Sequence, residues 1–186
     1  MKWKPITMPK EVVSDQSSAT ENYSRFIIEP LERGYGVTLG NSLRRVLLSS
    51  IQGAAVVSMR ITGCLHEFAT IPGVYEDVTN IVLNVKNLII RMHADEMQTL
   101  SLKATQKGKL TAGMFTGNPD IEILNPDQHI CELTDDVEFE MEIDIASGRG
   151  YHVAEMNKRM DAPAGTIYVD SLFSPVTKVS FQTENT

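Results

Sequence analysis

The chain has 186 residues and a formal net charge of −7 at pH 7, with 42% hydrophobic and 22% charged residues. This length suits one domain, or one domain with a large insertion, and the composition excludes a disordered chain. The charge is uneven, because residues 111–150 contain ten acids and one arginine, a net charge of −9, which leaves +2 elsewhere. Binding to a phosphate backbone needs a basic face, so this balance argues against it.

The cysteines and the start of the chain indicate the compartment. Cys64 and Cys131 are the two cysteines, and neither belongs to a CxxC motif. They fit neither a disulfide framework nor a zinc site, although one disulfide stays open as an alternative. Residues 1–20 contain no apolar run, and no stretch approaches the about 18–20 apolar residues of a membrane span. We expect a cytoplasmic protein with no metal, no cofactor and no membrane contact.

The first part of the chain predicts a strand, a helix and further strands. Residues 1–20 predict a weakly structured start, and residues 24–31 alternate and predict a strand that stops at Pro30. Gly34 and Gly36 precede a helical pattern that Gly53 ends. The predicted helix covers 38–50, and strands are predicted over 54–61 and 65–69.

A second helix is expected after Pro72 and Gly73. Glu76 and Asp77 would lie in its first turn and Lys86 in its last, the charge order that the helix dipole favours. Its apolar residues recur with the spacing of one buried face. These are Val74, Val78, Ile81, Val82 and Val85.

The rest of the chain predicts mainly strands. The clearest alternation runs from Val137 to Ile145, with acids between apolar residues. Residues 148–152 predict a turn and loop, and 156–165 predict a polar loop. The other expected strands are 88–93, 98–104, 109–115, 121–124, 129–134, 166–173 and 177–182. Two helices among many strands, out of βαβ order, indicate an α+β fold.

The glycine cluster before the first helix is a candidate nucleotide site. A dinucleotide fingerprint needs G-x-G-x-x-G, but Gly34, Gly36 and Gly40 are spaced one residue too long, and no G-K-[ST] follows for a phosphate loop. The simpler interpretation is a sharp turn that opens a helix. Gly40 inside a helix costs about 1 kcal/mol relative to Ala, so we expect another backbone to approach it closely.

Four acids on one face of the strand over 137–145 could hold a hard cation, but side chains on a strand face diverge, so a solvated sheet face is favoured.

His66 and Glu67 could form an acid–base pair, although no serine, cysteine or second carboxylate completes a catalytic set. Arg149 within GRGY could contact nucleic acid, but one arginine beside an acidic segment favours a turn. A small-molecule enzyme and a free-standing nucleic-acid-binding module therefore stay as alternatives.

The first helix has two distinct faces. At about 100° per residue, Leu39, Leu43 and Val46 fall on one side. Leu48 falls on the opposite side, between Arg44 and Arg45. Arginines around an apolar residue are typical of an interface, although a surface leucine beside solvated arginines is the other interpretation.

Three long segments resemble a known family. They are IIEPLERGYGVTLGNSLRRVLLSS, ITGCLHEFATIPGVYEDVTNIVLNVKNL and VDSLFSPVTKVSFQTENT, in that order, and the resemblance covers about 24–186. They are similar to the amino-terminal region of bacterial-type RNA polymerase alpha subunits. The resemblance implies a dimerisation domain formed by 1–52 and 175–186, with a mostly β insert domain over 53–174.

The resemblance also implies partners and contact residues. It implies a non-catalytic subunit that pairs with a second copy and carries the beta and beta-prime subunits, whose complex performs nucleotidyl transfer. We also expect no direct contact of this region with DNA, because the insert is acidic. The implied dimer contact comprises Leu31, Tyr35, Leu39, Leu43 and Val46; the beta contact Arg44, Arg45 and Leu48; and the beta-prime contact Lys86 and Val169.

The sequence stops earlier than the family pattern. Family members continue past Thr186 through a strand and a second long helix that packs across the dimer, and then a linker and a DNA-binding domain. We expect weak dimerisation or aggregation of the 186-residue chain alone, because the stripe with Leu39 would lack that helix.

Overall fold

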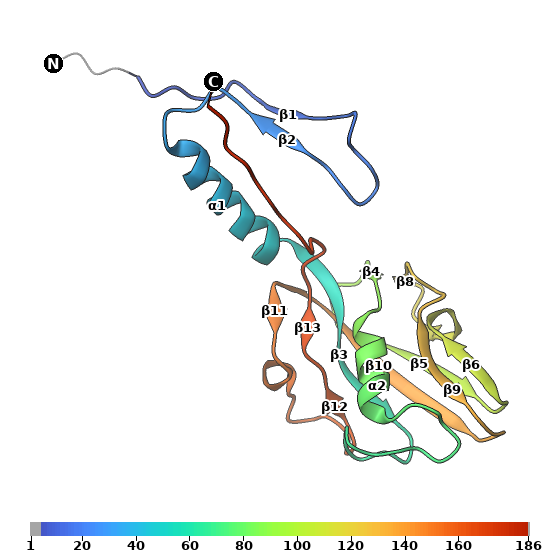
Figure 1. The fold of residues 1–186 in the computed structure, drawn as a ribbon. Coiled ribbons are helices and arrows are strands. Elements are labelled where there is room, and N and C mark those ends of the chain that lie inside the picture. The colour runs from blue at the N-terminus through green and yellow to red at the C-terminus, as the bar shows by residue number, and fades with distance from the viewer. Residues whose placement is uncertain (1–4, 186) are drawn as a thin grey trace. The chain divides into compact units, whose positions relative to one another are not determined.

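The computed structural model describes residues 5–185, which form two compact parts. We call them the terminal part, which comprises the chain up to Leu47 and from Lys178 on, and the central part, Leu48–Thr177. Across the described residues, two α-helices stand among thirteen strands, which confirms the predicted α+β class (Figure 1). The structure divides the chain after Leu47 and after Thr177, whereas the predicted boundaries lie after 52, five residues later, and after 174, three residues earlier.

The terminal part contains a two-stranded sheet and most of the first helix. Strand β1 (Val12–Ser14) pairs antiparallel with β2 (Phe26–Ile28), and α1 (Tyr35–Ser49) follows. β1 lies within the start that was predicted to be weakly structured. After it, the Asp15 carboxylate accepts hydrogen bonds from Ser17 and Ser18, and the Asp15 N–H donates to the Arg25 carbonyl next to β2. α1 begins three residues before its predicted start, since the N–H of Tyr35 already donates to the Glu32 carbonyl.

The central part is built on a seven-stranded sheet in the order β7-β5-β10-β3-β4-β8, with β12 also paired to β3 (Figure 1). Two small sheets, β6-β9 and β11-β13, complete it. The strands are β3 (Gln52–Ile61), β4 (Ile90–Met92), β5 (Gln98–Ala104), β6 (Gly108–Thr111), β7 (Thr116–Gly117), β8 (Ile121–Ile123), β9 (His129–Leu133), β10 (Phe139–Arg149), β11 (Tyr151–His152), β12 (Ile167–Tyr168) and β13 (Ser171–Leu172).

The hydrophobic core lies between this sheet and helix α2 (Val78–Lys86). Strand β10 shows the predicted alternation, because Phe139, Met141, Ile143 and Ile145 are buried while the acids between them are half-buried. Burial of a large apolar side chain contributes about 1.5–3 kcal/mol, so this row contributes to the stability of the central part together with the rest of the core.

Helix α2 contributes its predicted face to that core but starts later than expected. Val78, Ile81 and Val85 are fully buried. Asp77 precedes the first helical turn as the N-cap, and its carboxylate accepts the Asn80 N–H at 2.7 Å. Val74 lies outside the helix and instead bridges to β9.

Two predicted strands are absent from the described residues. Over 65–69, the Ala69 N–H donates to the His66 carbonyl, and this tight turn prevents an extended strand. Over 177–182, the chain pairs with no strand, and it packs through Phe181 against Gly40 of α1 instead.

Three other segments differ in detail. The turn predicted over 148–152 is partly strand, since β10 continues to Arg149 and β11 follows Gly150, whose φ of +68° makes the turn. The loop over 156–165 begins inside a 3₁₀ turn, Ala154–Asn157. The segment 109–115 leaves the strand conformation after Thr111 for a 3₁₀ turn, Ala112–Met114.

Candidate interaction surfaces

The residues of the expected dimer contact lie in the terminal part, mostly on α1. None of the fifteen residues of this helix is buried. Tyr35 is 44%, Leu43 43% and Val46 53% exposed, whereas Leu31 and Leu39 are half-buried. An amphipathic helix normally buries its apolar stripe, so this stripe has the character of a surface awaiting a partner.

One side of α1 is covered by the end of the chain. A Cβ added at Gly40 would lie 2.4 Å from the ring of Phe181, and one added at Gly36 would lie 2.8 Å from Thr183 Cγ2. The two glycines are four residues apart and therefore lie on one side of the helix. The expectation for Gly40 was right about close packing and wrong about the group, because an aromatic side chain approaches it rather than a backbone.

The residues of the expected beta contact occupy the second half of α1. Arg44 and Arg45 are exposed and Leu48 is half-buried. The sequence predicted Leu48 on a side of the helix away from Leu39, and the continuous helix from Tyr35 to Ser49 has that geometry.

The residues of the expected beta-prime contact come together although the sequence separates them widely. Lys86 ends α2, and its ammonium lies 3.6 Å from the carboxylate of Asp170, the residue after Val169. Val169 itself is only 2% exposed and belongs to the core. Its backbone is also engaged, because its N–H donates to Val57 and its carbonyl accepts from Asn157. The accessible groups at this place are therefore the exposed Lys86 and the half-buried Asp170, rather than the Val169 side chain.

Sequence reasoning missed Asp170 and Tyr151. The Asp170 carboxylate accepts the Ala154 N–H at 2.8 Å and a hydrogen bond from the Tyr151 hydroxyl. These two bonds lower the pKa of Asp170, and the carboxylate in turn raises the pKa of Tyr151. The alternation after Val169, with Asp170 and Leu172 more exposed than the buried Ser171 and Phe173, is the signal that could have indicated this surface.

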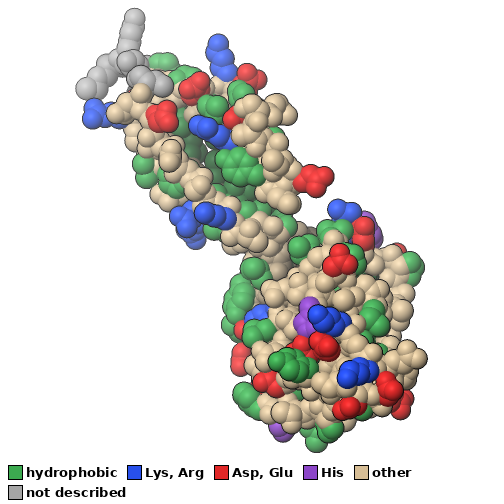
Figure 2. Space-filling model, turned by 45° about the vertical axis from the view of Figure 1, so that its right-hand side comes forward, with side chains coloured by type: hydrophobic (Ala, Val, Ile, Leu, Met, Phe, Trp, Pro, Cys, Tyr) green, Lys and Arg blue, Asp and Glu red, His purple; other side chains and the backbone are tan. Residues whose placement is uncertain are grey.

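The acidic face of β10 is paired rather than simply solvated. Glu140 lies 2.5 Å from Lys103, Glu142 pairs with Arg60, and Asp144 lies 2.8 Å from Arg159. The Lys103 ammonium lowers the pKa of Glu140. On the face of the central part that Figure 2 shows, acidic and basic side chains lie next to each other. Within residues 5–185, no group of three or more His, Cys, Asp or Glu side chains has the arrangement of a metal site.

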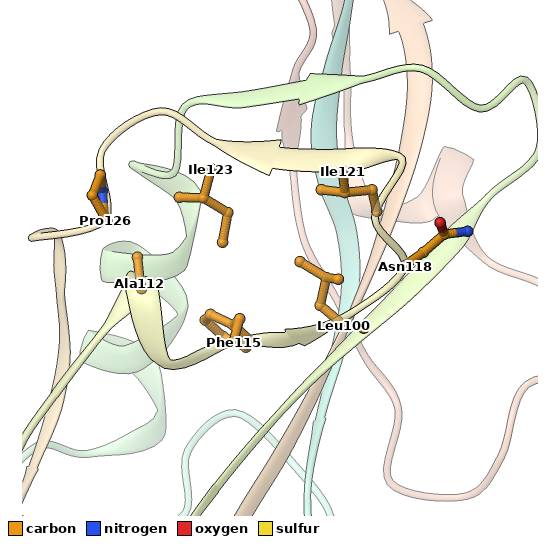
Figure 3. Close-up of a pocket in the computed structure, with 9 residues that line it drawn as sticks. Leu100, Ala112, Phe115, Asn118, Ile121, Ile123 and Pro126 are labelled. Atoms are coloured by element: carbon orange, nitrogen blue, oxygen red, sulfur yellow. The ribbon is translucent and has the colours of Figure 1, made fainter.

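The candidate acid–base pair, His66 and Glu67, lies exposed in a loop. A pocket of about 370 Å³ lies between β8 and residues 112–118 (Figure 3). It is lined mainly by apolar residues, and its one amide side chain, Asn118, already donates to Gln98. None of the lining residues can act as an acid or a base at neutral pH.

Two remaining expectations concern a possible disulfide and a membrane span. Cys64 and Cys131 are both buried as free thiols. Burial, with a smaller effect of Glu76, raises the pKa of Cys131 to about 12. Among the described residues, neither α-helix has the length and apolar character needed to cross a bilayer.

Residues 59–174 match the family described as the RNA polymerase Rpb3/RpoA insert domain, and the chain belongs to this family. It is also similar to curated proteins named DNA-directed RNA polymerase subunit alpha. The relative from Carboxydothermus hydrogenoformans is 55% identical over 89% of this chain and 53% of its own length. The relative from Alkaliphilus oremlandii is 54% identical over 97% of this chain and 57% of its own length. The chain thus spans about half the length of these relatives.

Proposed function

We propose that this chain acts as an assembly subunit of DNA-directed RNA polymerase. In this proposal it pairs with a second copy of itself in the cytoplasm and forms the platform on which the beta and beta-prime subunits assemble. It has no catalytic site of its own, and nucleotidyl transfer belongs to its partners. The family of the central part and the shared name of the relatives support this proposal.

One observation carries the pairing step. Helix α1 buries none of its fifteen residues although it presents an apolar stripe that includes Leu39, Leu43 and Val46. An isolated helix of this length is only marginally stable in water, so most of its stability must come from packing. The segment around Phe181, near the end of the described chain, supplies part of that packing. A second copy of the same stripe would supply the rest, with Tyr35 and Leu31 at its margin.

The other surfaces of the chain would serve the larger subunits. We assign Arg44, Arg45 and Leu48 to the beta contact, since arginine with an apolar neighbour is typical of interface anchors. We assign Lys86 and the chain around Val169 to the beta-prime contact, through the half-buried neighbours of Val169 because its own side chain is buried. The segment 111–150, with its net charge of −9, disfavours direct contact of this region with DNA.

Two valines on opposite sides of α1 provide a test of the pairing step and its matched control. Val46 is 53% and Val37 52% exposed, and their separation of nine residues places them about 180° apart on the helix. Val46→Asn should weaken self-association of the complete protein at least tenfold in sedimentation, whereas Val37→Asn should leave it unchanged. Asparagine is uncharged, so neither variant alters the helix dipole interaction. Equal self-association of both variants and the wild type would contradict the proposal.

A further inference from the structure

Four side chains from three separate segments meet at one place on the central part. We call this place the Lys86 surface, and it comprises Lys86, Tyr151, Asp170 and Leu172. Tyr151 lies directly opposite Leu172 in the antiparallel pair of β11 and β13. Residues that oppose each other in such a pair present their side chains on the same face. Lys86 belongs to the same place because its ammonium lies 3.6 Å from the carboxylate of Asp170.

The pair of strands β11 and β13, which carries most of this surface, is held in place through its opposite face. Ser171 is 1% exposed, and its hydroxyl donates to the Val56 carbonyl of β3 at 2.6 Å. Phe173 is 3% exposed, packs edge-on against the ring of His152, and donates its N–H to the Gly150 carbonyl. The outward residues of this pair of strands are therefore presented by a backbone that is anchored to the main sheet.

The outward residues combine apolar area with a charge. Tyr151 is 55% and Leu172 56% exposed, although both are large and adjacent. Exposed apolar side chains that cluster beside an organised polar group are typical of binding surfaces. A tyrosine with a fixed hydroxyl is also a common energetic anchor in such interfaces.

The carboxylate of Asp170 connects the polar groups of the surface. It accepts the Ala154 N–H at 2.8 Å, accepts a hydrogen bond from Tyr151 and attracts the Lys86 ammonium. At 3.6 Å the Lys86 contact is an ion pair and too long for a good hydrogen bond. Asp170 therefore restrains the position of the ammonium without using one of its N–H groups in a short bond.

We propose that the Lys86 surface binds a partner segment that presents an acceptor oxygen beside an apolar side chain, and that Asp170 is its positioning residue. Lys86 would donate to the oxygen, and Tyr151 with Leu172 would receive the apolar side chain. This inference rests on the proposed function, in which the beta-prime subunit occupies this place.

A double-mutant cycle tests the positioning role. The complete protein, assembled with the beta subunit, is titrated with beta-prime. Lys86→Met and Asp170→Asn should each weaken binding about five- to tenfold. If Asp170 acts through Lys86, the double variant should bind no more weakly than Lys86→Met. Asparagine retains an oxygen that can accept the Ala154 N–H, so the Asp170 variant should keep its fold, which its thermal unfolding checks.

A leucine pair tests the apolar half of the surface. Leu172→Ser should weaken the binding of beta-prime several-fold. Leu124→Ser is the matched control, since Leu124 is 43% exposed and follows β8, outside the Lys86 surface. Tyr151→Phe removes only the hydroxyl and keeps the ring, so its loss should be smaller than that of Leu172→Ser.

The outcomes separate this inference from the proposed function. Unchanged binding by Lys86→Met would contradict the beta-prime contact itself. Weaker binding by Lys86→Met, with normal binding by Asp170→Asn and Leu172→Ser, would overturn the inference and leave the proposed function standing. Additive losses in the double variant would show that Asp170 acts independently of Lys86, which also contradicts its positioning role.

Discussion

The ring of Phe181 occupies the space that a side chain at Gly40 would need. A Cβ built on Gly40 would lie 2.4 Å from Phe181 Cδ2, far inside van der Waals contact. Gly40 is a poor residue for a helix interior and costs about 1 kcal/mol relative to Ala, but it leaves the space that the Phe181 ring fills. The close approach links the end of the chain to α1 within the terminal part.

Gly40→Ala should therefore displace Phe181 and loosen residues 178–185. We expect a destabilisation of about 1–3 kcal/mol, as for other overpacked sites, visible as faster hydrogen exchange of the backbone amides in that segment. The effect should reverse in a Phe181→Ala background, where alanine at Gly40 would only improve the helix. If Gly40→Ala gives the same change in both backgrounds, the ring does not explain the glycine.

Substitutions on the other side of α1 should separate capture of the beta subunit from helix folding. Arg45→Ala and Leu48→Ala should each weaken beta binding at least tenfold in reconstitution, because arginine and apolar anchors contribute most to such interfaces. Both variants should keep their helical circular dichroism. Ser42→Ala on the same helix is the control. Normal beta binding by all three variants would contradict the assignment of Arg45 and Leu48 to the beta contact.

The pair of Glu140 and Lys103 predicts a pH-dependent contribution to stability. Lys103 lowers the pKa of Glu140, so the pair stabilises the native state above the ordinary glutamate pKa of about 4.3. This stabilisation is lost as the pH falls through the lowered native pKa. Glu140→Gln should lower the urea midpoint at pH 7 and have little effect at strongly acidic pH.

Lys103→Gln is the matched control for that pair, because it removes the same interaction from the other side. It should give the same loss at pH 7, and the double variant should lose little more than either single variant. A deficit of Glu140→Gln that stayed constant from neutral to strongly acidic pH would mean that ionisation of the pair is not its cause.

Cys131 should be chemically inert in the native protein. Its side chain is fully buried and its pKa is raised to about 12, so at pH 8 only roughly one molecule in ten thousand would carry the reactive thiolate. In a Cys64→Ser variant, a thiol reagent at pH 8 should label the remaining cysteine only after denaturant is added. Rapid labelling without denaturant would show that this part of the core opens readily.

The sequence predicted well those elements whose pattern follows from a single buried face. The strand over 98–104 and the alternation around Met141 were both right, because one side of each strand meets the core and the other does not. Helix α2 was predicted for the same reason. Its start was wrong because Asp77 caps the helix with its side chain, a local hydrogen bond that periodicity does not reveal.

The predictions failed where the conformation depends on a distant neighbour. Residues 65–69 and 177–182 have strand-like composition, but neither segment pairs with a strand in the described structure. A strand requires a ladder partner, and sequence pattern alone does not show whether one is present. The close packing of Phe181 on Gly40 decides the second case.

The sequence by itself determined the α+β class, the apolar stripe of α1 and the family to which the chain belongs, since each can be read from the order of residues along the chain. Only the tertiary structure decided that Val169 is buried and that Lys86 meets Asp170 and Tyr151 on one surface. Those residues are far apart in the chain, and the pairing of β11 with β13 beside α2 brings them together. Long-range packing, which no local pattern encodes, thus decided which side chains are available to a partner.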